Sequence, residues 1–159
     1  MPLLSGLKAI LNKSKLYMTA RYTIENCQKE NTKTIIDGIN AYNLSKVAAT
    51  ADIWTPLEYV MKDENGIEIA GVLSGIGYWN GLEIQILWVK EGHRHKGIGT
   101  RLLNYVELAA IEKGATIAML DTFDFQAEGF YLKNGYKPIG EINNFPKGHR
   151  RIYFSKKLV

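Results

Sequence analysis

The chain has 159 residues, is 46% hydrophobic and carries a net charge of +4. A chain of this length can bury about 70% of its unfolded surface, so it can build a core without disulfides or a structural metal. Its one cysteine, Cys27, excludes an internal disulfide framework and predicts a buried thiol in a reducing, cytoplasmic setting.

The excess positive charge lies at the N-terminus. Four cations and no acidic residue precede Glu25, and the remaining Lys and Arg residues equal the Asp and Glu residues in number. A broadly basic face for nucleic acid is therefore not expected. Residues 1–18 combine a leucine-rich helical face with lysines but are too short and interrupted to span a membrane. They predict an N-terminal extension ahead of a domain over residues 19–159.

A strand and a helix are expected first. Residues 21–25 predict a short strand, and apolar residues at helical spacing over 35–42 predict a helix capped by Asn31 or Thr32. Residues 43–54 have no clear pattern.

Two hairpin turns follow. Asn65-Gly66 and Asn80-Gly81 are typical of tight turns because both residue types accept a positive φ. We therefore expect three consecutive antiparallel strands, over residues 57–61, 67–78 and 82–89.

The C-terminal half alternates helices and strands. A helix is expected from Gly97 to Lys113-Gly114, then a buried strand over 116–121. Asp124 is expected to cap a second helix that ends at Gly135. Two final strands are expected over residues 137–142 and 151–158. This order predicts an α/β fold with a mixed sheet flanked by helices.

The connection GHRHKGIG, residues 92–99, predicts an anion site. A helix start leaves backbone N–H groups unpaired, and Gly97 and Gly99 would let a diphosphate approach them closely. Arg94, Lys96 and Arg101 add positive charge in the same turn. A glycine-rich connection with ordinary surface cations is the alternative.

The spacing excludes two common phosphate motifs. A Walker loop needs a lysine directly after its last glycine, whereas Lys96 precedes Gly97. A dinucleotide fingerprint needs a third glycine, and Leu102 stands in that place. An R-x-x-G-x-G pattern of Arg94, Gly97 and Gly99 remains.

In this strand–loop–helix setting the pattern resembles the phosphate-binding motif of the GNAT superfamily of acyl-CoA N-acyltransferases. The later segment FYLKNGY, from Phe130 to Tyr136, resembles the family's terminal F-Y-x-x-x-G-F/Y signature. The resemblance implies a mostly antiparallel sheet with a V-shaped cleft between strands four and five. It also implies acetyl-CoA as cosubstrate and no metal.

The family's binding roles transfer by resemblance. Backbone groups of Leu87, Trp88 and Val89 would hold the pantetheine arm and the oxyanion, and the N–H groups from Arg94 to Thr100 would hold the diphosphate. The residues expected to bind acetyl-CoA are Leu87, Trp88, Val89, Arg94, His95, Lys96, Gly97, Ile98, Gly99, Thr100 and Phe130.

Two residues are expected to be catalytic. Tyr131 occupies the family's tyrosine position, and a phenol can donate a proton to the departing thiolate. Glu83 lies four residues before Leu87, and every second residue of a strand faces the same side. It would therefore lie on the cleft side as general base unless a bulge intervenes. Asp121 and Asp124 are rival bases. Tyr136 is expected to be a packing residue.

The resemblance implies transfer of an acetyl group from acetyl-CoA to a primary amine of a small molecule, by direct attack through a tetrahedral intermediate. The segment TFDFQA, residues 122–127, looks like small-molecule members, with Tyr42 and Trp54 as pocket residues by resemblance. A protein or aminoacyl-tRNA acetyltransferase and a silent acyl-CoA sensor are the alternatives. A monomer or a homodimer, without membrane or nucleic-acid partners, is expected.

Overall fold

The computed structural model describes residues 22–159, which form two units, residues 22–48 and Ala49–Val159. The predicted extension over residues 1–18 lies outside the described residues. The domain boundary at residue 19 also lies outside them and stays a prediction.

The first unit contains one helix, α2 (Lys29–Lys46). It begins before the expected cap because Asn31 Oδ1 accepts a hydrogen bond of 2.9 Å from the backbone N–H of Gln28. The strand expected over 21–25 is wrong for its described part, since residues 22–28 have no regular structure and no strand pairs with them. The expectation of a buried thiol is also wrong, because Cys27 is exposed.

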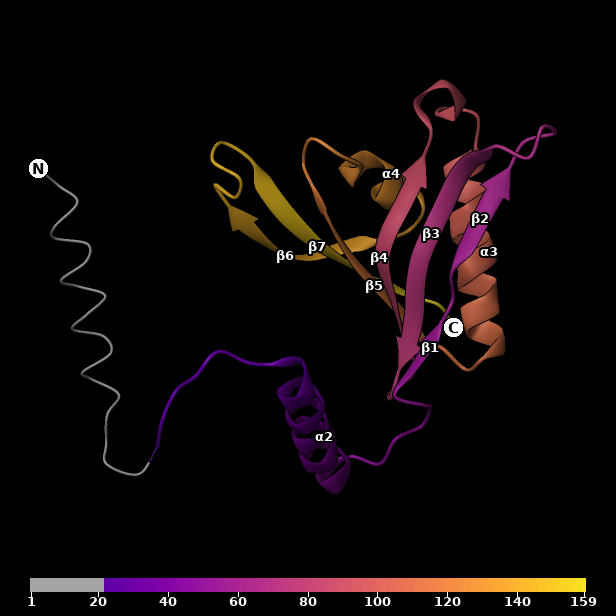
Figure 1. Cartoon of the computed structure of the whole chain (residues 1–159). Helices are drawn as coiled ribbons and strands as arrows, with labels where there is room; N and C mark the ends of the chain where they lie inside the picture. The colour runs from indigo at the N-terminus through magenta and orange to yellow at the C-terminus, as the bar shows by residue number, and fades with distance from the viewer. Residues whose placement is uncertain (1–21) are drawn as a thin grey trace, which may run out of the picture. The chain divides into compact units, whose positions relative to one another are not determined.

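The second unit is built on one sheet with strand order β1-β3-β4-β5-β7-β6, in which β2 also pairs with β3 (Figure 1). Its strands are β1 (Trp54–Pro56), β2 (Tyr59–Lys62), β3 (Glu68–Gly77), β4 (Gly81–Val89), β5 (Ile117–Phe123), β6 (Lys137–Asn143) and β7 (Arg150–Lys157). Only β4 and β5 pair in parallel; the other pairs in residues 49–159 are antiparallel. The predicted mixed, mostly antiparallel sheet is confirmed.

Both predicted hairpins are confirmed. In the first, Asp63 Oδ1 accepts hydrogen bonds from the N–H groups of Asn65 and Ile67, and Gly66 has φ +79°. In the second, the turn comes earlier than predicted, because the Asn80 N–H donates to the Gly77 carbonyl at 3.1 Å and Gly81 already begins β4; Asn80 takes φ +57°. These turns place β2, β3 and β4 side by side, and the helix that covers them follows in the sequence.

That helix is α3 (Ile98–Glu112), which follows the short 3₁₀ helix η1 (Glu91–His93). It packs on one face of β3 and β4 and buries Leu102, Leu103 and Val106 there. Gly114 ends it with φ +88°, as predicted. We call the opposite face of the sheet the open face.

The second helix, α4 (Glu128–Lys133), begins later than predicted. Asp124 does not cap it, because its Oδ1 lies 3.0 Å from His149 Nδ1 and its Oδ2 accepts a bond from the backbone N–H of Arg150. Asp124 thus ties the β5–α4 turn to β7.

In the described part of the chain, neither α2 nor any later helix has the length and hydropathy needed to cross a membrane. The cytoplasmic location stays a prediction from the cysteine content.

Candidate active site

The sheet divides between β4 and β5. The two strands pair only over residues 81–84 and 117–120. Beyond this short ladder β4 continues beside β3, while β5 continues beside β7. Figure 1 shows the two arms separating, with α4 on the side of β5. The predicted V-shaped cleft is therefore present, and we call this division the fork.

A cavity of about 960 Å³ lies at the fork, lined from β4, the start of α3, the end of β5 and α4. It brings together most of the residues expected to bind acetyl-CoA. Those lining it are Leu87, Trp88, Val89, Arg94, His95, Gly97, Ile98, Gly99, Thr100 and Phe130. Lys96 is not among them, because its Nζ turns back and donates a 2.9 Å hydrogen bond to the carbonyl of Gly92.

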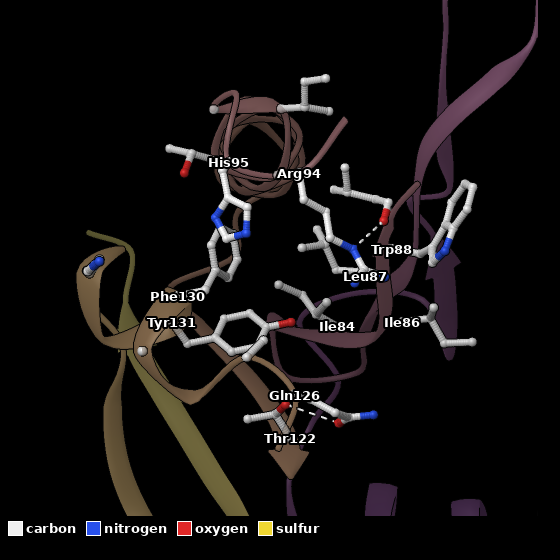
Figure 2. A pocket seen from close by; sticks show the side chains of 18 of the residues that line it. Ile84, Ile86, Leu87, Trp88, Arg94, His95, Thr122, Gln126, Phe130 and Tyr131 are labelled. Carbon is white, nitrogen blue, oxygen red and sulfur yellow. Dashed lines mark hydrogen bonds between the residues drawn. The ribbon is translucent and has the colours of Figure 1, made fainter. Parts of the chain in front are cut away.

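The turn before α3 has the backbone of an anion site. Gly97 is the N-cap with φ +74°, a conformation that other residues rarely adopt, and the Arg101 N–H donates to its carbonyl at 3.0 Å. The N–H groups of Ile98, Gly99 and Thr100 precede this first helical bond. The guanidinium of Arg94 is anchored, since its Nε donates to the carbonyl of Val89 at 3.0 Å (Figure 2).

Gly99 has a packing role in addition to the binding role expected of it. A Cβ there would lie 3.3 Å from the Phe130 ring and 3.5 Å from Val89 Cγ2. The glycine therefore allows α3 to pack closely against Phe130 and β4. At Gly97, by contrast, a Cβ would meet open space, and the positive φ is what favours glycine.

Tyr131 is buried except at the cavity. Its ring packs edge-to-face against Phe130 and Tyr136, with centroids 5.1 and 5.7 Å away. Figure 2 shows its hydroxyl pointing toward Ile84 and Leu87 of β4. Burial, and next the charge of Asp121, raise the pKa of Tyr131 to about 12. The phenol therefore keeps its proton at neutral pH and can act as an acid.

A buried polar network holds Tyr136, which packs against Tyr131. Glu107 of α3, which is 6% exposed, accepts a 2.8 Å hydrogen bond from Tyr136 Oη and a 2.6 Å hydrogen bond from Lys156 Nζ. Burial and the neighbouring Glu107 carboxylate raise the pKa of Tyr136. Tyr136, predicted to be a packing residue, is indeed buried and fixes one side of the Tyr131 ring.

The parity argument for Glu83 is wrong because β4 contains a bulge. Leu73 pairs with Ile86 and Ser74 with Ile84, so Gln85 is the extra residue. The bulge puts Glu83 on the face opposite to Leu87, where it is exposed and does not line the cavity.

Glu83 instead lies on the open face beside an aromatic ring. It pairs with Gly75 of β3 and Met119 of β5. The Trp54 ring lies directly on Gly75, where a Cβ could not fit. Trp54 and Glu83 thus share the open face near the fork. Tyr42, the other pocket residue expected by resemblance, lies on α2 in the first unit.

Sequence reasoning missed several lining residues or gave them no binding role. They are Ile84, Gln85, Ile86, His93, Asp121, Thr122, Phe125, Gln126, Ala127, Gly129 and Lys133. Asp121, weighed only as a rival base, is held by Arg151, whose Nε and Nη2 donate to its carboxylate at 2.6 and 2.8 Å. Gln126 Oε1 accepts a hydrogen bond from the Phe123 N–H and closes the turn after β5. The position of this turn directly before the FYLKNGY segment is the signal that could have marked it.

Within residues 22–159, no group of three or more His, Cys, Asp or Glu side chains is arranged to hold a metal ion. The donors that the cavity offers include the Tyr131 hydroxyl and the cationic side chains of Arg94 and Lys133, and backbone N–H groups lie at the start of α3. Such a site can hold a phosphorylated ligand and supply one proton.

Comparison with known proteins gives a consistent result. Residues 56–138 match the model of the acetyltransferase (GNAT) domain. A blasticidin-S acetyltransferase from Streptomyces morookaense is 40% identical over 92 residues, which cover 57% of this chain and 68% of that protein.

Solved structures give the same fold. The crystal structure of an acetyltransferase from Bacillus cereus ATCC 14579 is 36% identical, with a TM-score of 0.79 over 86% of this chain and 97% of that one. An aminoglycoside 6′-N-acetyltransferase solved with coenzyme A is 19% identical, with a TM-score of 0.59 over 76% of this chain and 78% of that one. At that identity the second likeness concerns the fold alone.

Proposed function

Because this chain belongs to the GNAT acetyltransferase family and is an acyl-CoA N-acyltransferase that uses acetyl-CoA, we propose that it acetylates a primary amine of a small molecule. The blasticidin-S acetyltransferase relative supports a small acceptor. The balanced charge of residues 25–159 also favours a small acceptor over an RNA.

One observation carries the proposal. A single cavity at the fork joins the anion-binding turn at Gly97 to the hydroxyl of Tyr131. A diphosphate at the start of α3 would let the rest of coenzyme A run along the separated edge of β4. There, backbone groups of Leu87, Trp88 and Val89 would hold the pantetheine arm and the developing oxyanion.

The reaction then needs two bond changes and two proton transfers. The neutral amine nitrogen attacks the thioester carbonyl, a carbon–nitrogen bond forms, and the carbon–sulfur bond breaks from the tetrahedral intermediate. The thiolate leaves with the bonding pair and receives the Tyr131 proton, which its high pKa keeps in place until this step. The amine loses one proton to a base, and proton exchange with water then returns the base and Tyr131 to their starting protonation states.

We propose Glu83 as that base, acting through water from the open face. It has no ion-pair partner among the described residues, whereas both carboxylate oxygens of the rival Asp121 accept bonds from Arg151. Asp124, the other rival, is bound to His149 and Arg150. The amine would then reach the fork from the side opposite to α3.

The proposal is tested by thiol release from acetyl-CoA across acceptor classes. The panel contains blasticidin S, an aminoglycoside, a polyamine, a lysine peptide and an aminoacyl-tRNA. We expect release with at least one small amine and none with the peptide or the tRNA.

Each other outcome contradicts part of the proposal. Release with the peptide or the tRNA alone would move the acceptor to a macromolecule. Binding of acetyl-CoA without thiol release from any amine would favour the silent sensor. A Tyr131→Phe variant separates enzymatic release from slow hydrolysis of the thioester.

A further inference from the structure

The open face beside the fork carries alternate residues of β5. Ala118, Leu120 and Thr122 are buried toward the helices, so Met119, Asp121 and Phe123 point to the open face. This is the face on which Glu83 lies, because Glu83 and Met119 are neighbours in the β4–β5 ladder. An amine that reaches the fork from this side meets Asp121 and the turn after β5.

A flat apolar wall stands at that point. The Phe123 and Phe125 rings are stacked with centroids 5.2 Å apart and an angle of 7°. The Arg151 guanidinium lies 5.8 Å from the Phe123 centroid, and His149 meets Phe125 nearly at right angles. Phe125 lines the cavity yet is 56% exposed. Both rings of the wall therefore have packing partners within the fold, while more than half of Phe125 is exposed.

A fixed carboxylate lies next to the wall. Asp121 is the one carboxylate among the described residues that line the cavity. Arg151 holds its orientation with two hydrogen bonds, but a carboxylate has about four acceptor positions, so some remain for a ligand. Its side chain is 31% exposed.

The two ends of the cavity thus carry side chains of opposite charge. The turn before α3 and the end of α4 contribute Arg94 and Lys133, which suit a diphosphate, while the β5 end contributes Asp121. A free amine is cationic before it loses its proton, so the β5 end suits the ammonium form. An aromatic wall next to a carboxylate favours a cation attached to a flat ring, since stacking and ion pairing can act together.

Given the acetyl transfer proposed above, we propose that Phe123, Phe125 and Asp121 form an acceptor subsite for a cationic amine that carries a flat conjugated ring. The ring would lie against Phe125, and the ammonium group would pair with Asp121. The ammonium group would then lose one proton to bulk water, and the neutral amine would attack the thioester carbon at the fork.

The test uses two amines with the same side-chain length, 2-phenylethylamine with a flat aromatic ring and 2-cyclohexylethylamine with a puckered saturated ring. Each is titrated by ligand-observed NMR into the full chain loaded with coenzyme A, which permits binding without turnover. We expect the phenyl amine to bind about threefold to tenfold more tightly, as aromatic stacking provides. Simple hydrophobic burial would favour the more apolar cyclohexyl amine.

Two variants assign the preference to this wall. Phe125→Leu should abolish the difference between the amines, with the cyclohexyl Kd within about twofold of the wild-type value. Tyr105→Leu removes a ring of similar exposure on α3, outside this cavity, and should leave the preference unchanged. Asp121→Asn should weaken both amines by a similar factor.

The subsite is overturned if the cyclohexyl amine binds as tightly as the phenyl amine, or if Phe125→Leu keeps the preference. These results are independent of catalysis. Thiol release from other amines without a ring preference would overturn the subsite alone, whereas absence of release from every amine would overturn the proposed function whatever the binding data show.

Discussion

The two ends of the cavity are built in different ways. The end proposed for the diphosphate is one continuous segment, residues 94–100, which would donate backbone N–H groups at the start of α3. The acceptor end consists of side chains from separate elements: Tyr131 from α4, Asp121 from β5 and Arg151 from β7. The first end therefore depends on local backbone conformation and the second on tertiary packing.

This difference predicts separable effects. Substitutions at the turn should change coenzyme A affinity, and substitutions at the acceptor end should change the rate or the choice of amine. A substitution at one end that changes the property of the other would break the distinction.

The largest effect is expected at Tyr131. Tyr131→Phe should lower kcat tenfold or more, because general acid catalysis contributes about 10²–10⁴-fold. The Kd for acetyl-CoA should stay within about twofold. Steady-state kinetics and calorimetry check the two values, and an unchanged kcat would remove Tyr131 from the mechanism.

The pH profile sharpens the same point. The pKa of Tyr131 is raised from 10.0 to about 12, so the acid form persists as the pH rises through 10. We expect no loss of kcat from deprotonation of this phenol between about pH 7 and 10. A fall in that range that Tyr131→Phe removes would show a much lower pKa.

A smaller rate effect is expected at the base. Glu83→Gln should lower kcat/KM several-fold near neutral pH and have less effect at high pH, where more of the amine is already neutral. Asp121→Asn is the matched comparison and should mainly raise KM for the amine. If Asp121→Asn shows the pH-dependent loss instead, Asp121 is the base.

The smallest effect concerns stability. Tyr136→Phe should lower the free energy of unfolding by about 1–2 kcal/mol, because Glu107 loses a buried hydrogen bond. The pKa of Tyr136 is raised in the fold, so its contribution is present below pH 10 and is lost as the pH rises above 10. Tyr105→Phe, at an exposed ring, should change stability by less than about 0.5 kcal/mol. Urea unfolding measures both variants, and equal losses would contradict a role for the network.

Most of the fold could be predicted because its signals are local. The hairpins at Gly66 and Asn80 and the helix ends at Gly97 and Gly114 depend on turn chemistry within a few residues. The strand expected over 21–25 had the right residue types, but its described part has no partner strand, and a strand depends on its partner. The start of α4 was misplaced because Asp124 bonds to β7, which is remote in sequence.

The site could be predicted to the extent that it is local. The segment around Gly97 was found from its spacing. The bulge at Gln85 reversed the face of Glu83, and the alternation could not locate it because residues 86–89 are all apolar. The Asp121–Arg151 pair joins residues 30 positions apart. The Glu107–Lys156 pair spans 49 positions. Pairing at such distances is a property of the folded sheet rather than of a short motif.

The central claim is that the amides at the start of α3 hold the diphosphate of coenzyme A. Calorimetric titration of coenzyme A into wild type, Gly97→Val and Gly92→Ala tests it, once circular dichroism shows that all three are folded. Valine is strained at φ +74°, whereas Gly92 has no positive φ and open space around it. We predict that wild type and Gly92→Ala bind alike and that Gly97→Val binds tenfold or more weakly. Absence of binding to wild type, or equal affinity in Gly97→Val, would contradict the claim.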